Sequence, residues 1–563
     1  MNYQDYQKNS AIALKKRQAS LVLKNAYIVD VFSESIYQGD IAIEDGLIVA
    51  IGNYNGINEV DLTNKYVTPG FIDAHLHLET TMVMPQELIN EASLQGTTTF
   101  IVDPHEAVNV AGVAGLNFMI EQTDHVNANV YYMLPSCVPV SKNEENGCDF
   151  NIELMKDYLT NPRVLGLGEV MDYTAVVNAD KMIHEKLNLF KTRIKDGHAP
   201  GLSDERLNAY ALAKIKTDHE STSYEYALKQ LRCGMNVLIR EGSGARNLDN
   251  IVKGIVKNKI GLDSFAFCTD DKHIEDIKRE GHISYNIRRS IELGIKPIQA
   301  IKMATLNAAR IYKLEHLGAI APSYQADLVV LDDLETIKIS AVYQQGKLVE
   351  NKSLNKPIIA KQLLNSIQTI NLTTADLQLK VNKQDHIIKV IDHEILTDHL
   401  VADLPQQDGY FKADENYNKI VTIERHKKTG NYAIGALQNF NLKGGAIATS
   451  IAHDSHNIII VGDNDESIIE AFKILKENQG GFVIATPKDS LSLPLPIMGL
   501  MSNQSHQFVQ DRLKEMKNLA YQLGVNPNID PFVVLSFLSL TVIPKLRLTT
   551  KGLYDVEKEV YLK

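Results

Sequence analysis

FIDAHLHLE, residues 71–79, is the stretch from which the fold can be worked out. Phe71 and Ile72 favour a strand, and helix-forming residues follow only after Pro85. Alternate side chains of a strand share a face, so His75 and His77 point the same way. Taken alone, they are best explained as ordinary polar residues at a strand edge. They become a metal site only if further ligands lie at the ends of other strands.

The next 240 residues alternate between strand and helix patterns. Apolar runs of strand length follow helical segments at 85–95, 111–123 and 151–159. This alternation favours a (β/α)8 TIM-like barrel over a doubly wound open sheet, and barrel enzymes carry their functional residues at the C-terminal ends of the strands. The expected strands are 97–103, 129–135, 163–170, 236–243 and 264–270.

The segments on either side of the barrel differ from it in pattern. A polar helix over 1–19 and short alternating runs over 21–69 predict a small β-domain, which later β-runs are expected to complete. The C-terminal third mixes strands and helices. We therefore predict an α/β chain with an N-terminal helix and β-domain (1–69, completed by 315–352), a metal-dependent hydrolase barrel (70–314) and a C-terminal α+β domain (353–563).

Composition limits the classes of function. The chain has 563 residues, 44% hydrophobic and 23% charged, with a net charge of −11 and no basic block. These features favour a globular protein without nucleic-acid or membrane partners. The longest apolar run, 532–543, is too short to span a bilayer, and the first residues lack a signal peptide. Four cysteines without CxxC spacing suit a reduced, cytoplasmic location.

Four further metal-ligand residues occur where barrel strands are expected to end. All are imidazoles or carboxylates, a set that favours Zn, Mn or Fe. Together with His75 and His77 they are too many for one tetrahedral zinc, so they fit two metal ions. The additional ligands are Glu169, His198, His219 and Asp270. Glu169 suits the bridging position because its carboxylate has two oxygens.

The chemistry also suggests catalytic roles. Asp270 is expected both to ligate a metal and to move a proton, because it is the first residue past its strand, whereas Asp271 should point away by alternation. Glu79 shares the face of His77, where it either shuttles a proton and contacts substrate or orients a histidine.

Polar residues near other strand ends are candidate substrate contacts. His105 and Glu106 follow the second barrel strand, and Ser136 and Ser243 follow later ones. The glycines beside Ser243 would allow close approach of a flat base. A serine nucleophile at EGSGA fits its motif poorly. The pair in AHDSH (453–456) is best explained as a polar turn, and the alternatives are an extra metal site or a reach into a neighbouring barrel mouth.

The sequence resembles the bacterial adenine deaminase family of the amidohydrolase superfamily over most of its length. The resemblance rests on PGFIDAHLHLETTM, GTTTFIVDPHEAVNVAG, LPSCVPVS, GLGEVMDYTAVV, DGHAPGLSDERLNAY, TDHESTSYEYAL, VLIREGSGARNL, FCTDDKH and IAHDSHNIIIVG. It implies a two-metal site on the six ligands above, usually with manganese, possible with iron and less suited to zinc. It also implies hydrolytic deamination of adenine to hypoxanthine and ammonia in purine salvage.

Two alternatives stay open on sequence alone. One is another amidohydrolase acting on a cyclic amide or an amino-substituted base, although a glutamate (Glu169) replaces the metal-bridging lysine of many cyclic amidases. The other is a catalytically silent binding relative, although no ligand is missing. Adenine and water are the expected small-molecule partners, and the expected assembly is a homo-oligomer, a dimer.

Overall fold

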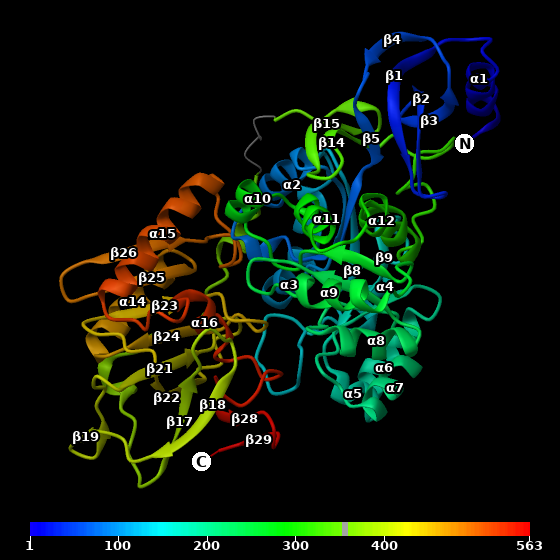
Figure 1. Ribbon diagram of the computed structural model, residues 1–563. Coiled ribbons are helices and arrows are strands. Elements are labelled where there is room, and N and C mark those ends of the chain that lie inside the picture. Colours follow the sequence, from blue (N-terminus) through cyan, green and yellow to red (C-terminus); the bar gives the residue numbers. More distant parts are fainter. Residues whose placement is uncertain (352–357, 563) are drawn as a thin grey trace.

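The computed structural model describes residues 1–351 and 358–562. At its centre is a ring of parallel strands with helices around it (Figure 1). The predicted (β/α)8 fold is confirmed. The predicted domain boundaries stay predictions, and the one between 352 and 353, like residue 563, lies outside the described residues.

Two runs of parallel strands make the ring and close it at two seams. At one seam the amide N–H of His77 donates to the Asp270 carbonyl (3.1 Å) and the Asp270 N–H donates to the His75 carbonyl (3.0 Å). At the other, the Lys216 N–H donates to the Lys195 carbonyl (3.1 Å). The strands are β6 (Phe71–Leu76), β7 (Thr97–Val102), β8 (Asn129–Leu134), β9 (Val164–Val170), β10 (Ile194–Gly197), β11 (Thr217–Asp218), β12 (Asn236–Arg240) and β13 (Phe265–Cys268).

Apolar side chains fill the inside of the ring, as expected for a barrel of this size. Ile72, Ile101, Met133 and Leu238, each from a different strand, belong to one buried cluster. The predicted ligand side chains lie above this apolar layer, at the ends of the strands. The site is thus built on a packed base.

Helices follow the strands and cover the ring. They are α2 (Pro85–Leu94), α3 (His105–Gln122), α4 (Ile152–Lys156), α5 (Tyr173–Val177), α6 (Lys181–Leu189), α7 (Asp204–Leu212), α8 (Tyr224–Arg232), α9 (Leu248–Asn258), α10 (Ile274–Glu280), α11 (Ile283–Glu292), α12 (Pro297–Lys302) and α13 (Ala308–Ile311). A π-helical turn (Met303–Asn307) joins the last two.

Strands from both flanks of the barrel share one sheet. β14 pairs antiparallel with β5, so residues 328–331 lie beside residues 66–69. Helix α1 (Tyr3–Ala13) packs at β3. The sheet contains β1 (Ala19–Asp30), β2 (Ser35–Glu44), β3 (Leu47–Gly52), β4 (Gly56–Asp61), β5 (Tyr66–Pro69), β14 (Leu328–Asp333), β15 (Lys338–Gln344) and β16 (Lys347–Leu348).

The C-terminal part, yellow to red in Figure 1, has its own eight-stranded sheet. Its strands are β17 (Asp385–Val390), β18 (Thr397–Ala402), β21 (Tyr417–Ile423), β22 (Tyr432–Gln438), β23 (Ala446–Thr449), β24 (Ile458–Gly462), β25 (Gly481–Ala485) and β26 (Ser490–Pro494). Smaller elements are β19 (Gln406–Gln407), β20 (Tyr410–Phe411), β27 (Leu546–Thr549), β28 (Gly552–Asp555), β29 (Val560–Tyr561), α14 (Asp465–Glu477), α15 (His506–Gln522) and α16 (Pro531–Phe537).

This C-terminal part packs directly on the barrel. Leu88 of α2 and Phe118 of α3 share one buried apolar cluster with Ile497 and Leu500. The Ser502 N–H donates to the Met82 carbonyl (2.9 Å) in the loop after β6. The connection between β23 and β24 is thereby brought to the barrel mouth.

Two helices differ from the prediction. The helix expected over 1–19 ends at Ala13, since Lys15 takes a left-handed conformation (φ 59°) and β1 begins at Ala19. The helix expected from 111 begins at His105, with a break at Gly112 (φ 55°). Glycine tolerates this conformation, so the chain bends there and resumes the helix. Among the helices that the structure describes, none has the length and apolar character needed to cross a membrane.

The close packing below the site gives a prediction about Gly168 in β9. A Cβ at this position would lie 2.1 Å from Asp103 Oδ2, the oxygen that accepts the Glu169 N–H. Gly168→Ala should cost about 1–3 kcal/mol of stability because of this overpacking. Thermal and denaturant unfolding measure it. Gly261→Ala is the control, since its Cβ meets no atom within 4 Å. Equal stability of the two variants would contradict the prediction.

Candidate metal centre

The strand ends bring the six predicted ligands together. His75 lies in β6 and Glu169 in β9, and the other four follow β6, β10, β11 and β13 within two residues. Two groups of three residues share Glu169. In each group, one ligand atom from each residue lies within 4.8 Å of the other two. The triads are His75–His77–Glu169 and Glu169–His198–His219. A third triad is His75–His219–Asp270.

Each oxygen of Glu169 faces a different pair of imidazoles. Oε1 lies 3.2 Å from His77 Nε2 and 3.7 Å from His75 Nε2. Oε2 lies 2.7 Å from His198 Nδ1 and 3.4 Å from His219 Nε2. The carboxylate therefore divides the site into two halves. This is the geometry that a bridging ligand between two cations needs.

Asp270 belongs to the half with His75 and His77. Its Oδ1 lies 3.1 Å from His77 Nε2 and 3.5 Å from His75 Nε2. Its Oδ2 accepts a hydrogen bond from Arg240 (2.9 Å), whose guanidinium also pairs with Glu220. Arg240 therefore orients this carboxylate with one oxygen toward the histidines.

Supporting residues orient the ligands. Asp103 contributes twice: its carbonyl bonds His77 Nδ1 (2.7 Å) and its Oδ2 accepts the Glu169 N–H (2.9 Å). The first bond turns His77 Nε2 into the site. The Ser136 hydroxyl donates to the Glu169 carbonyl (2.5 Å). The backbone at the bridge position is thus held at both its N–H and its carbonyl.

The electrostatics of the centre fit metal ions. In residues 1–351 and 358–562, neither ring nitrogen of the fully buried His75 meets a hydrogen-bond partner. Burial by itself would raise the pKa of Glu169, but hydrogen bonds from His198, His219 and His77 hold it well below its usual range. Divalent transition metals bind donor sets of this kind, in which a buried ionised carboxylate lies beside an imidazole nitrogen that makes no hydrogen bond within the described chain.

Asp271 also lies near the mouth. Alternation does not separate it from Asp270, because β13 ends at Cys268 and Asp270 is left-handed (φ 59°). Burial raises the pKa of Asp271, and the Asp270 carboxylate adds to this shift. Its Oδ1 is buried and has no hydrogen-bond partner among the described residues. The choice of Asp270 as ligand stays a prediction, and its position beside His75 and His77 favours it.

Glu79 faces a cavity between the barrel and the C-terminal part. Its Oε1 accepts the Ala107 N–H (3.1 Å), while its Oε2 has no hydrogen-bond partner in the described chain. Burial raises the pKa of Glu79 to about 7. The cavity is lined by Glu79, Thr80, Glu106, Ile451, His453, His456 and Leu500.

The predicted substrate residues occupy different surroundings. His105 Nδ1 lies 3.4 Å from Glu169 Oε1, beside the ligands, and Glu106 lines the cavity. The Ser136 hydroxyl is used by the Glu169 backbone. The Ser243 hydroxyl donates to Asp276 and accepts the His273 N–H (2.9 Å). Their roles toward substrate stay predictions.

Sequence reasoning missed several residues of the centre. Asp103, Glu220 and Arg240 lie at or just beyond the ends of β7, β11 and β12, so the strand-end rule could have found them. His453 was interpreted as part of a turn. Its place beside Glu106 has no local signal, because 347 residues separate the two.

Comparison with known proteins agrees with the fold and with a metal-dependent family. Residues 66–360 match the model of the amidohydrolase family, whose members depend on metal ions. The barrel with its nitrogen and oxygen ligands at the mouth defines a hydrolase of this class. Residues 394–560 match the adenine deaminase C-terminal domain.

Individual relatives narrow the assignment. A protein of Desulfitobacterium hafniense (strain Y51) named adenine deaminase is 54% identical, with 100% of both chains covered. One of the same name from Clostridium acetobutylicum is 45% identical over 97% of each chain. A crystal structure titled as an adenine deaminase aligns at 16% identity and TM-score 0.46, covering 60% of this chain and 99% of that one. The chain belongs to the adenine deaminase family, which confirms the resemblance.

The two-sided geometry of Glu169 gives a prediction. Glu169→Gln keeps the size of the side chain but removes the charge shared by both halves. Metal affinity should fall by at least the roughly 10–100-fold typical of groups that only support a ligand, and turnover should fall with it. Elemental analysis and steady-state assays measure both. Glu241→Gln is the control, because this strand-end glutamate pairs with Arg246 outside the centre. Full metal content and activity in Glu169→Gln would exclude the bridging role.

Proposed function

We propose that this chain hydrolyses adenine to hypoxanthine and ammonia with two divalent metal ions at the candidate centre. The observation that carries the proposal is the full-length relationship to adenine deaminases together with a complete set of six ligands. His75, His77, Glu169 and Asp270 would hold one ion. Glu169, His198 and His219 would hold the other.

Manganese is the proposed metal, with iron as the next candidate and zinc less suited. The nitrogen and oxygen donors are compatible with all three. When bound, such ions lower the pKa of a coordinated water and so supply a nucleophile near neutral pH. The protein must then place the base, move protons and release ammonia.

Asp270 is the proposed proton carrier. Water adds to C6 of the purine, the C6–N6 bond breaks, and the leaving nitrogen takes up a proton as ammonia. Asp270 can accept the proton of the attacking water with Oδ1 and pass it to that nitrogen. Arg240, bonded to Oδ2, supports this role by fixing the orientation of the carboxylate.

Glu79 is the proposed partner of the purine ring. Glu79 lines the cavity, and its Oε2 has no partner among the described residues. It can therefore donate a proton to a ring nitrogen as water adds to C6, and the second proton of that water would restore Glu79 when the C6–N6 bond breaks. Thr80 and Leu500 line the same cavity, so a polar and an apolar wall are available to a flat base. His105 and Glu106 are kept as further contacts.

The setting of the enzyme is proposed from its sequence and family. We infer a cytoplasmic enzyme of purine salvage, a homodimer with adenine and water as its small-molecule partners. The net charge of −11 without a basic block supports the absence of nucleic-acid and membrane partners.

The two neighbouring aspartates give a prediction. Asp270→Asn removes the base but keeps the side chain's size, so kcat should fall by roughly 10²–10⁴-fold. Metal content should fall less, because five ligands remain. Asp271→Asn is the matched variant and should be milder, since Asp270 and not Asp271 pairs with His75 and His77. Both are assayed for kcat and metal content at equal loading. A dead Asp271→Asn with an active Asp270→Asn would move the proton carrier to Asp271.

The family relationship gives a prediction about substrate. The relatives that match the full chain are named adenine deaminases, so the free base is the expected substrate. Free adenine should release ammonia readily, and adenosine far less. A coupled ammonia assay with both compounds, and with chelator-treated protein as the blank, measures this. Equal or faster release from adenosine would contradict the assignment.

A further inference from the structure

A second cluster of ligand-type side chains lies beside the metal centre. Glu106 begins helix α3 of the barrel, and His453 and His456 lie in the loop between β23 and β24. We propose that these three residues form a separate site for a divalent transition-metal ion, which fastens the C-terminal part to the barrel mouth. This ion would be distinct from the two at the candidate metal centre, and its ligands Glu106 and His453 also line the proposed substrate cavity.

The geometry supports a single ion. One ligand atom from each residue lies within 4.8 Å of the other two. Glu106 Oε1 contacts His453 Nδ1, and Glu106 Oε2 contacts His456 Nε2. Glu106 is 2% exposed and His456 1%. The cluster is buried, and none of its members belongs to the six ligands.

Of the buried acids around this cluster, Glu106 and Asp454 are paired with histidines. Glu79, Glu106, Glu144 and Asp454 are all buried here, and within the described residues none pairs with a lysine or an arginine. Buried carboxylates are costly without a counter-charge, and a bound cation would supply it.

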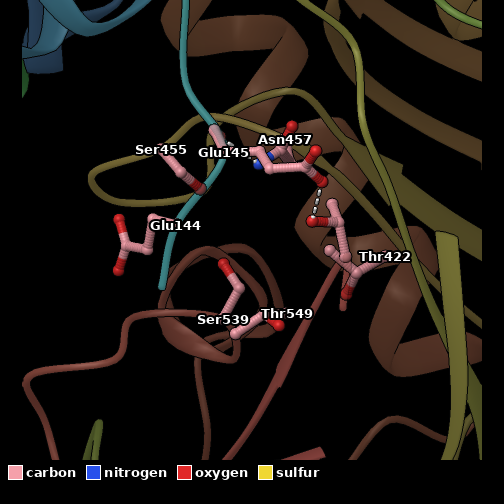
Figure 2. A pocket seen from close by; sticks show the side chains of 8 residues that line it. Glu144, Glu145, Thr422, Ser455, Asn457, Ser539 and Thr549 are labelled. Atoms are coloured by element: carbon pink, nitrogen blue, oxygen red, sulfur yellow. Dashed lines mark hydrogen bonds between the residues drawn. The ribbon is translucent and has the colours of Figure 1, made fainter. Parts of the chain in front are cut away.

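The loop that carries the histidines is held in place by other contacts. Figure 2 shows Glu144, Glu145, Ser455 and Asn457 meeting where a barrel loop enters the C-terminal part. Asn457 Nδ2 donates to the Glu145 carbonyl (2.7 Å), and the Thr550 hydroxyl donates to Glu145 Oε2 (2.5 Å).

Neighbouring groups orient the two imidazoles themselves. The His453 ring stacks on Phe537 with a centroid distance of 4.7 Å. The backbone N–H of His456 donates to the Ala452 carbonyl (2.6 Å), which tightens the turn that carries the imidazole. The imidazoles are therefore positioned before any ion binds, which lowers the cost of binding.

The donor set suggests the class of ion. Two imidazoles and one carboxylate are a three-ligand set of the kind that binds zinc with a fourth position open. The cavity lies on that side of the cluster, where Glu79 Oε2 has no partner in the described chain. Zn2+ should bind more tightly than Mn2+ at such a site.

The alternative is a hydrogen-bonded triad without an ion. The Ala452 N–H approaches His456 Nδ1 at 3.3 Å, and in that arrangement the Nε2–H would donate to Glu106. An ion at Nε2 requires the proton to move to Nδ1. The hydrogen-bonded triad would bind no metal ion, whereas the proposed site would bind one.

Metal counting on the full-length protein tests the proposal. The protein is stripped with a chelator, reloaded with Zn2+ or with Mn2+ alone, passed through a desalting column and analysed for bound metal. Zinc-loaded wild type should hold three equivalents. His456→Asn and Glu106→Gln should each hold one fewer, whereas the control His316→Asn, an exposed histidine, should match wild type. Circular dichroism verifies folding.

Crystallography of the zinc-loaded wild type covers the case in which a variant fails to fold. An anomalous scattering peak between Glu106, His453 and His456 is expected. No peak there, or an equal metal count in wild type and folded Glu106→Gln, would overturn the proposal in favour of the triad. Glu169→Gln separates the two centres, because it should keep the zinc at Glu106 while losing metal at its own site.

Discussion

A buried carboxylate with histidines on both sides imposes the strictest demand on this structure. Glu169 is 2% exposed, and each of its oxygens faces two imidazole nitrogens of the predicted ligands. A charge placed so deeply must be matched by cations or by donors. Strands β6, β9, β10, β11 and β13 must therefore end at the same level of the barrel. The hydrogen bonds between β6 and β13, close to Asp270, align the ends of these two strands.

The apolar base of the barrel and the polar mouth depend on each other. The ring is filled by Ile72, Ile101, Met133 and Leu238. The ligand side chains therefore lie above this apolar layer, and bound ions would lie at the rim of the barrel. Asp103 connects the layers, because it receives the Glu169 N–H beside the tightly packed Gly168 and positions His77 through its carbonyl. Rigid support of this kind is what an active site needs to keep its geometry.

The C-terminal part completes the mouth from above. Its loop between β23 and β24 supplies His453 and His456, and Leu500 adds an apolar surface. The continuous apolar cluster that includes Leu88 and Leu500 makes this contact a part of the core. The proposed substrate cavity therefore belongs to neither part alone. An ion at Glu106 would add a polar fastening to this apolar contact.

Local pattern in the sequence determined the barrel, the flanking β-runs and the choice of six ligands, because strand periodicity and strand ends are properties of neighbouring residues. The same rule could have found Arg240 and Glu220. It could not resolve the register at Asp270, where a left-handed residue breaks the alternation on which the rule depends.

Only the tertiary structure decided that His453 meets Glu106 across 347 residues and that Ser136 supports the Glu169 backbone. Such contacts arise from the packing of whole elements against one another, and no short stretch of sequence encodes that packing.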